Sequence, residues 1–353
     1  MLILGMEEAF NCDLMMAISK SPVLLSMLFI QTTTSIITIP LLLITIRNVS
    51  SMNLIHYNTK IILLVFLIAL MTQSTSRAAL HGLDLIIFLL LYPNDCNIRP
   101  SLSRCFLMRI PVNFSTFLAC TSTFMISLER LISTWKFKAY ESNRSVGLLL
   151  IMIQVLLAGF LFMLMYIKPT LHLRHSIYYC ITTTPNEPLL TIIPFSVLVI
   201  LQILAVIILK LLRCLNKIRS ARQKLKPSLA QRYSITENMR TITIVIPFCL
   251  ISSIFTSIFM ITLCFILFFN NLFSKPTYFA LVDGSMMLPM FSLLLPVIIK
   301  RMNDRFNQKT HEAFQQHIAL SNRTNEIGNV YFDSLVWAWK SKNEETPAVM
   351  ANE

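Results

Sequence analysis

The sequence has few charged residues. Asp, Glu, Lys and Arg make up only 13% of its 353 residues, whereas apolar residues make up 55%. Soluble domains carry about 25% charged residues, because they need a large polar surface. A soluble globule of this length is therefore excluded, and the composition predicts a membrane protein.

The sequence also lacks the short motifs of common enzyme classes. It has no phosphate-binding G-x-x-x-x-G-K-[ST] loop, no G-x-S-x-G nucleophile turn and no H-E-x-x-H zinc motif. Its net charge is +13, but the basic residues are not interleaved with aromatic residues in a nucleic-acid-binding domain. We therefore expect no enzymatic activity, no catalytic residue, no cofactor, no metal site and no nucleic-acid partner.

Long apolar stretches make up most of the chain. Each is long enough to cross a bilayer as a helix, and helices pair the backbone groups internally, as lipid requires. We predict an all-α membrane protein with a bundle of seven transmembrane helices. Apolar residues continue after the second stretch, so we expect that helix to extend past the membrane surface. The predicted stretches are 23–46, 60–82, 105–133, 146–167, 189–212, 241–269 and 277–299.

The distribution of basic residues predicts the orientation. Most of the 30 Lys and Arg fall on one side of the predicted membrane, above all in the loop 210–240 and the tail. Because basic residues favour the cytoplasmic side, we predict that the amino terminus is outside. The domains are then an extracellular segment 1–22, the seven-helix domain 23–299 and a cytoplasmic tail 300–353. The basic loop is also expected to attract anionic membrane lipids.

The third stretch has a cysteine at one end and an acid–base pair at the other. A helix from Cys105 to Arg130 rises about 38 Å, somewhat more than the roughly 30 Å of the hydrocarbon core. One end can therefore be tied to an outer loop by a disulfide, while Glu129 and Arg130 reach the inner face. This is the plan of the third helix in a seven-helix receptor.

Four of the eight cysteines fall on the predicted outer side, which is oxidising. Sequence alone leaves three pairings open for four cysteines. Cys105 begins the third stretch and Cys180 lies in the loop between the fourth and fifth, and we predict that these two are bonded. Cys12 and Cys96 are then a possible second pair.

Five ionisable residues lie in the outer halves of the predicted spans or just beyond them. Arg77, His81 and Asp84 are spaced four and three apart, so they share one helix face. They are either a ligand site or a buried structural group in which Arg77 pairs with Asp84. Asp283 is either the counter-ion of Arg109 or a ligand contact. All five are candidate ligand-binding residues, because ionisable groups in a membrane mark functional sites.

Prolines interrupt the last two stretches. Pro247 is expected to kink the sixth helix, and Pro289 and Pro296 the seventh. The segment Ser234-x-x-Glu237 is a capping-box pattern that begins a helix before the sixth span. The sixth helix is therefore expected to extend into the cytosol as a rigid lever.

An ordered set of short motifs resembles one receptor family. The set covers roughly residues 12–300 and resembles the nematode serpentine chemoreceptors of the alpha/beta class, Srab, in the Sra superfamily. Its members are Cys12, Ser21, Ile39-Pro40-Leu41, His56-x-Asn58-x-Lys60, Arg77, His81, Asp84-Leu85, Cys96, Cys105, Arg109, Glu129-Arg130, Tyr140-Glu141 and Leu229-Ala-Gln-Arg232-Tyr233-Ser-Ile-Thr-Glu237-Asn238.

The resemblance implies a G-protein-coupled sensory receptor, located in the plasma membrane of sensory-neuron cilia. Its partners are then a small-molecule ligand outside and a heterotrimeric G-protein inside. The residues expected to couple to the G-protein are Glu129, Arg130, Arg232, Tyr233, Glu237 and Asn238.

Two alternatives remain open at this point. Arg130 is either a switch, held by an acid until activation frees it, or a plain anchor at the end of a helix. The function is either that of a receptor or that of a transporter or ligand-gated channel subunit. Transporters often contain internal repeats, and no repeat relates the two halves of this sequence.

Overall fold

The structure is a computed structural model that describes residues 12–51, 56–91, 102–135, 145–166, 178–181, 188–222, 229–286 and 288–301, and the single positions 304, 308 and 315. Within these ranges, the side chains at 91, 102, 220–222, 229–238, 240 and 244 are not described. The chain divides into two units, Met1–Ile299 and Lys300–Glu353.

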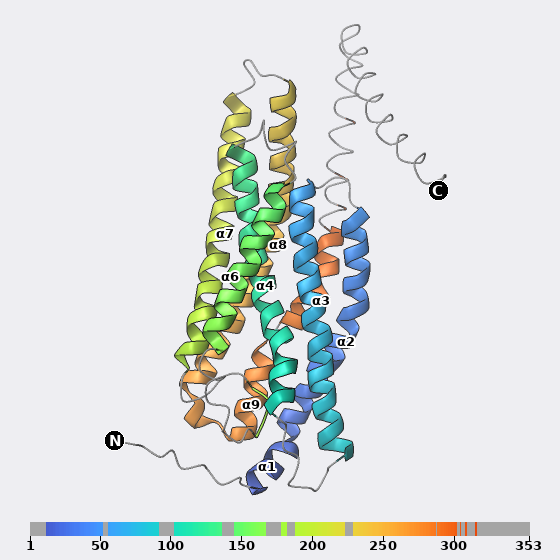
Figure 1. The fold of residues 1–353 in the computed structure, drawn as a ribbon. Helices are drawn as coiled ribbons and strands as arrows, with labels where there is room; N and C mark the ends of the chain where they lie inside the picture. Colours follow the sequence, from blue (N-terminus) through green and yellow to red (C-terminus); the bar gives the residue numbers. More distant parts are fainter. Residues whose placement is uncertain are drawn as a thin grey trace, which may run out of the picture. The chain divides into compact units, whose positions relative to one another are not determined.

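The first unit is a bundle of long helices that run alongside one another (Figure 1). Seven of the described helices are long and apolar enough to cross a membrane, as the sequence predicts. The second span extends beyond its predicted end through a π-helical segment, because its apolar residues continue. The elements are α1 (Cys12–Ser19), α2 (Pro22–Ser51), α3 (Tyr57–Ile86), η1 (Ile87–Leu91), α4 (Leu102–Trp135), α6 (Ser145–Tyr166), α7 (Leu189–Arg222), α8 (Leu229–Phe268), η2 (Asn270–Leu272) and α9 (Lys275–Ser285), followed by a helix over 288–301.

Helix α4 is the centre of the bundle. It packs against α3, α6, α7 and α8 (Figure 1). In its most apolar window 72% of the residues are buried, against 28% in α2 and in α6. Its buried face includes small polar residues such as Ser122, Thr123 and Ser127, which are fully enclosed. Helix α4 therefore carries polar side chains through the interior while the outer helices face lipid.

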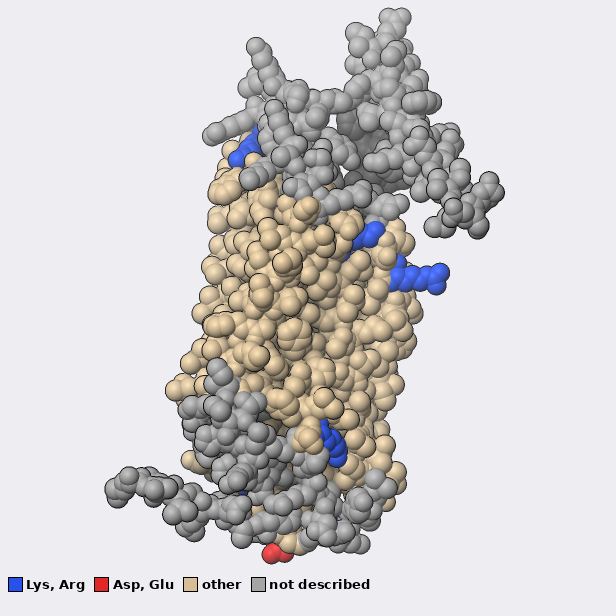
Figure 2. All heavy atoms as spheres, in the orientation of Figure 1, with Lys and Arg blue, Asp and Glu red and all other residues tan. Residues whose placement is uncertain are grey.

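The apolar exteriors of the outer helices support a membrane setting. Helix α6 exposes Leu149, Met152 and Leu156, and α7 exposes Ile200 and Leu211. The middle of the bundle is almost entirely free of charged side chains on the face shown, and basic side chains lie toward its ends (Figure 2). An apolar belt of this kind is stable in hydrocarbon but not in water.

The seventh span is broken just after Asp283. Helix α9 ends at Ser285, Met286 has a non-helical ψ of 85°, and helical structure resumes at residue 288. Pro289 explains the break, because it has no N–H to donate to the carbonyl group of Ser285. The expected effect of Pro289 is thus confirmed, and the break places Asp283 and Met286 at a helix end within the bundle.

Candidate functional site

A disulfide joins Cys105, at the start of α4, to Cys180, in the segment 178–181. The two Cα atoms are 5.4 Å apart, and both residues are buried. The predicted pair is therefore confirmed. Cys12 is also disulfide-bonded; Cys96, its predicted partner, lies outside the described residues.

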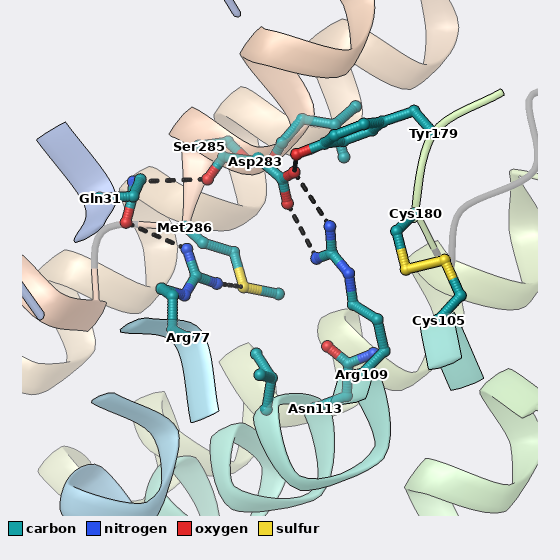
Figure 3. Close-up of polar contacts among 12 residues, drawn as sticks. Gln31, Arg77, Cys105, Arg109, Asn113, Tyr179, Cys180, Asp283, Ser285 and Met286 are labelled. Atoms are coloured by element: carbon teal, nitrogen blue, oxygen red, sulfur yellow. Dashed lines mark hydrogen bonds and ion pairs between the residues drawn. A yellow bond between two sulfur atoms is a disulfide. The ribbon is translucent and has the colours of Figure 1, made fainter. Parts of the chain in front are cut away.

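Three buried side chains from distant parts of the sequence meet beside this disulfide (Figure 3). Arg109 Nη1 and Nη2 donate to Asp283 Oδ1 and Oδ2 at 2.8 and 3.0 Å. Tyr179 Oη donates to Asp283 Oδ2 at 2.6 Å. Arg109, Tyr179 and Asp283 are called the disulfide-side cluster below. Of the two alternatives for Asp283, the structure has the ion pair with Arg109.

Burial keeps Tyr179 in its neutral, hydrogen-donating form. Its pKa is raised well above the usual value, first by burial and then by the negative charge of Asp283. Tyr179 was not predicted from the sequence. The signal that places it is the neighbouring Cys180, because the disulfide holds this segment against the start of α4.

The residues on the shared face of α3 do not pair with one another. Asp84 forms an ion pair with Arg104, from the first turn of α4. Arg77 donates to Gln31 Oε1 at 3.1 Å and to the sulfur atom of Met286. The alternative that pairs Arg77 with Asp84 is therefore wrong, because a partner on the adjacent helix is nearer. His81 is completely buried on the same face.

A small cavity lies against the disulfide-side cluster. Its volume is about 20 Å³, enough for about one water molecule. Arg109, Asp283 and Met286 form part of its wall. The rest of the wall is mostly apolar and includes Phe195, Phe259 and Leu263.

A second charged cluster lies toward the other end of α4. Arg130 forms an ion pair with its neighbour Glu129. Thr59 on α3 joins them: its hydroxyl donates to Glu129 Oε2 at 3.0 Å and lies 2.7 Å from Arg130 Nη2. Arg130 is 2% exposed and Glu129 is fully buried. Thr59, Glu129 and Arg130 are called the Glu–Arg cluster below.

His56 and Thr134 are neighbours of the Glu–Arg cluster. Burial lowers the pKa of His56, and the positive charge of Arg130 lowers it further. Thr134, one turn beyond Arg130, accepts from Arg219 of α7 through its carbonyl oxygen at 3.1 Å. Arg232, Tyr233, Glu237 and Asn238 belong to the first turns of α8, and their side chains lie outside the description.

The described part of the bundle has seven spans, and the third is tied by a disulfide at one end and carries an acid–base pair toward the other. This combination defines a seven-helix receptor. Residues 9–340 match the family of serpentine-type seven-transmembrane G-protein-coupled receptors, class ab chemoreceptors. The chain belongs to this family of nematode receptors, as its motifs predict, and the family is not one of enzymes. Ligands and G-proteins are the general partners of such receptors.

Two relatives from Caenorhabditis elegans are similar to this chain. Serpentine receptor class beta-16 is 23% identical over 290 residues, which is 80% of this chain and 83% of the relative. Serpentine receptor class alpha/beta-14 is 28% identical over 163 residues, which is 44% of this chain and 40% of the relative. The first match spans most of both chains, in agreement with the family assignment.

Proposed function

We propose that this chain is a sensory receptor that binds an external small molecule beside the disulfide-side cluster and activates a heterotrimeric G-protein through the Glu–Arg cluster. The observation that carries the proposal is the pair of buried charged clusters on one helix. Arg109 and Arg130 are about 21 residues apart on α4, or roughly 32 Å. One central helix therefore connects the two ends of the bundle.

The disulfide-side cluster is suited to respond to a ligand. Its members come from α4, the segment 178–181 and α9, so a molecule in the adjacent cavity bears on three elements at once. The cavity is small, so the ligand must widen it. Widening moves at least one of the elements that form the wall, among them α8 with Phe259 and α9 with Asp283. A ligand that prefers the wider form shifts the population toward it.

The Glu–Arg cluster is suited to act as a releasable contact. Arg130 is held by Glu129 and Thr59 and is buried, so it does not present its charge to a partner. Movement of the cytosolic part of α8, with Pro247 as a hinge, opens a cavity in which Arg130 meets the G-protein. The residues Arg232, Tyr233, Glu237 and Asn238 at the start of α8 then face the same partner. The basic residues between 210 and 240, which include the end of α7 and the start of α8, bind anionic lipids.

The proposed setting is the plasma membrane of sensory-neuron cilia, with the amino terminus outside. Epitope tags at residue 2 and at residue 353 test the orientation in intact cells. We expect the first to stain without permeabilisation and the second only after it. The reverse pattern would contradict the receptor proposal, because the basic loop would then face away from any G-protein.

A ligand screen in a heterologous cell tests the function itself. The receptor is co-expressed with a promiscuous G-protein α subunit, and intracellular calcium is recorded against a chemical panel. We expect an agonist response that disappears when the G-protein is omitted or inhibited. An agonist-evoked current that persists without a G-protein would instead indicate a ligand-gated channel subunit, and ligand uptake would indicate a transporter.

A further inference from the structure

Arg77 is a buried cation without a carboxylate partner. Its side chain is fully enclosed in the middle of α3, with 0% exposure. Among the described residues, its contacts are the amide oxygen of Gln31 and the sulfur atom of Met286, and its Nε has no hydrogen-bond partner (Figure 3). The other buried arginines discussed above, Arg109 and Arg130, are each paired with an acid.

An unneutralised charge in this position is costly. Charged groups in a membrane bundle normally pair with one another, and breaking such a pair costs several kcal/mol. Neither present contact supplies a negative charge, and a thioether is a weak acceptor. The charge of Asp283 acts on Arg77 from a distance, but that carboxylate is already bound by Arg109. The arrangement is therefore suited to receive an anion rather than to stabilise the bundle as it stands.

The neighbouring side chains on α3 offer further donors. Gln73 lies four residues before Arg77 and His81 four residues after it, so the three share one helix face. All three are completely buried. Both side-chain atoms of the Gln73 amide and both ring nitrogens of His81 lack a hydrogen-bond partner within the described part of the chain. Buried polar atoms nearly always have hydrogen-bond partners. The column formed by Gln73, Arg77 and His81 therefore has donors and acceptors that can bind a polar group.

Met286 separates this column from the cavity. Its side chain contacts Arg77 and also forms part of the cavity wall. It belongs to the non-helical break of the seventh span, where its backbone N–H donates to the carbonyl oxygen of Asp283 at 3.3 Å and does not continue the α-helical pattern. Methionine is unbranched and flexible, so its side chain can swing aside at small cost. The thioether of Met286 thus lies between a ligand in the cavity and Arg77.

We propose that Arg77 binds an anion, supplied by the carboxylate of an organic-acid ligand that displaces the Met286 side chain. This inference rests on the proposed function, because it assigns a chemical class to the ligand of the same cavity. The carboxylate pairs with the Arg77 guanidinium and accepts from Gln73 or His81. The apolar part of the acid lies against Phe195, Phe259 and Leu263. Arg109 does not compete for the anion, because Asp283 already neutralises it. A free chloride ion has the same chemistry and is the other possible source.

The first test needs no ligand. Thermal unfolding of the purified receptor in detergent, in sulfate buffer, is compared for wild type, Arg77→Gln and Arg104→Gln. We expect Arg77→Gln to raise the melting temperature, because it removes an unpaired buried charge. Arg104→Gln makes the same change in charge but leaves Asp84 unpaired, so it should lower the melting temperature. A lower melting temperature for Arg77→Gln would show that Arg77 is structural and would overturn the proposal.

The second test measures binding directly. Butanoic, hexanoic and octanoic acid are each compared with their methyl esters by ligand-induced shifts in melting temperature. We expect the acids, not the esters, to stabilise the wild type, and Arg77→Gln to bind them about tenfold to a hundredfold more weakly. Arg104→Gln should retain the shift caused by the acids. Equal shifts with acids and esters, or equal affinity in Arg77→Gln, would overturn the proposal.

Two further arms separate the sources of the anion and the two proposals. The first compares sodium chloride with sodium sulfate at equal ionic strength. If chloride stabilises the wild type more than sulfate does, Arg77→Gln loses this difference and the acids add nothing to it, the anion is chloride. Acid binding without any G-protein response would contradict the proposed function but support the anion site. Signalling by neutral ligands only, with no anion effect, would support the function and overturn the anion site.

Discussion

The two charged clusters on α4 are built in opposite ways. In the disulfide-side cluster the acid and the base are far apart in the sequence, on α4 and α9, and Tyr179 adds a third element. In the Glu–Arg cluster the acid and the base are neighbours on one helix, and only Thr59 comes from elsewhere. The ion pair of the first cluster therefore joins two helices, whereas the ion pair of the second lies within α4 and can open without separating two helices.

This difference suggests a division of labour. Breaking the ion pair between Arg109 and Asp283 separates two helices, so its loss should appear mainly as lost stability. Breaking the pair between Glu129 and Arg130 changes only which partner Arg130 faces, so its loss should appear mainly as lost signalling. The following predictions, from the largest expected effect to the smallest, test that contrast.

The largest effect is expected for Arg130→Ala. It should abolish G-protein signalling while surface expression stays near normal, because the arginine is proposed to contact the G-protein and its ion-pair partner Glu129 lies on the same helix. Agonist-evoked calcium and surface staining measure the two quantities in the same cells. Arg47→Ala removes an exposed arginine near the end of α2 and serves as a matched control. Signalling by Arg130→Ala at wild-type strength would leave Arg130 as a plain membrane anchor.

Asp283→Asn should show the opposite profile. It leaves Arg109 buried and unpaired, so we expect a loss of about 3–5 kcal/mol in the free energy of unfolding. Unfolding of the purified protein in detergent measures it. Asp13→Asn, on the exposed face of α1, is the control for the same change in charge. The double variant Arg109→Gln with Asp283→Asn should recover part of the loss. Equal stability of Asp283→Asn and Asp13→Asn would show that the ion pair between Arg109 and Asp283 has no structural role.

Cys105→Ser should destabilise the same end of the bundle. The disulfide closes a loop with a sequence separation of 75, and removing a native disulfide costs about 2–5 kcal/mol. The control is Cys214→Ser, because Cys214 is a free, exposed cysteine. Mass spectrometry of non-reduced peptides checks the bond directly. Free thiols at both Cys105 and Cys180 would contradict the pairing.

Tyr179→Phe should give the smallest effect. The change removes one hydrogen bond to a charged acceptor, worth about 1.5–3 kcal/mol, and leaves the ion pair intact. Unfolding in detergent measures it, with Tyr57→Phe on the exposed face of α3 as the control. A loss as large as that of Asp283→Asn would mean that Tyr179, rather than Arg109, holds Asp283 in place.

The fold was largely predictable from the sequence because a membrane imposes simple rules. Apolar length defines the spans, and Pro289 marks the break in the last one. The pairing of Cys105 with Cys180 followed from their predicted positions at one end of the bundle. The orientation, the sides of the domains and the coupling residues at the start of α8 remain predictions.

The contacts between helices were less predictable. Spacing along one helix correctly placed Arg77 and Asp84 on one face, but it could not reveal Arg104, which reaches Asp84 from the next helix. Thr59 and Met286 carry no charge, so nothing in their local sequence marks them as neighbours of Arg130 and Arg77. Such partners depend on how helices rotate and pack, which one-dimensional spacing does not encode.

The most direct test of the central claim is whether the two ends of the bundle are thermodynamically coupled. Affinity of an agonist from the screen is measured on the purified receptor, with and without nucleotide-free G-protein. Coupling requires that each partner raises the affinity of the other by the same factor. We predict tighter agonist binding with the G-protein in wild type and no change in Arg130→Ala. Agonist affinity that is the same with and without the G-protein in wild type would contradict the account.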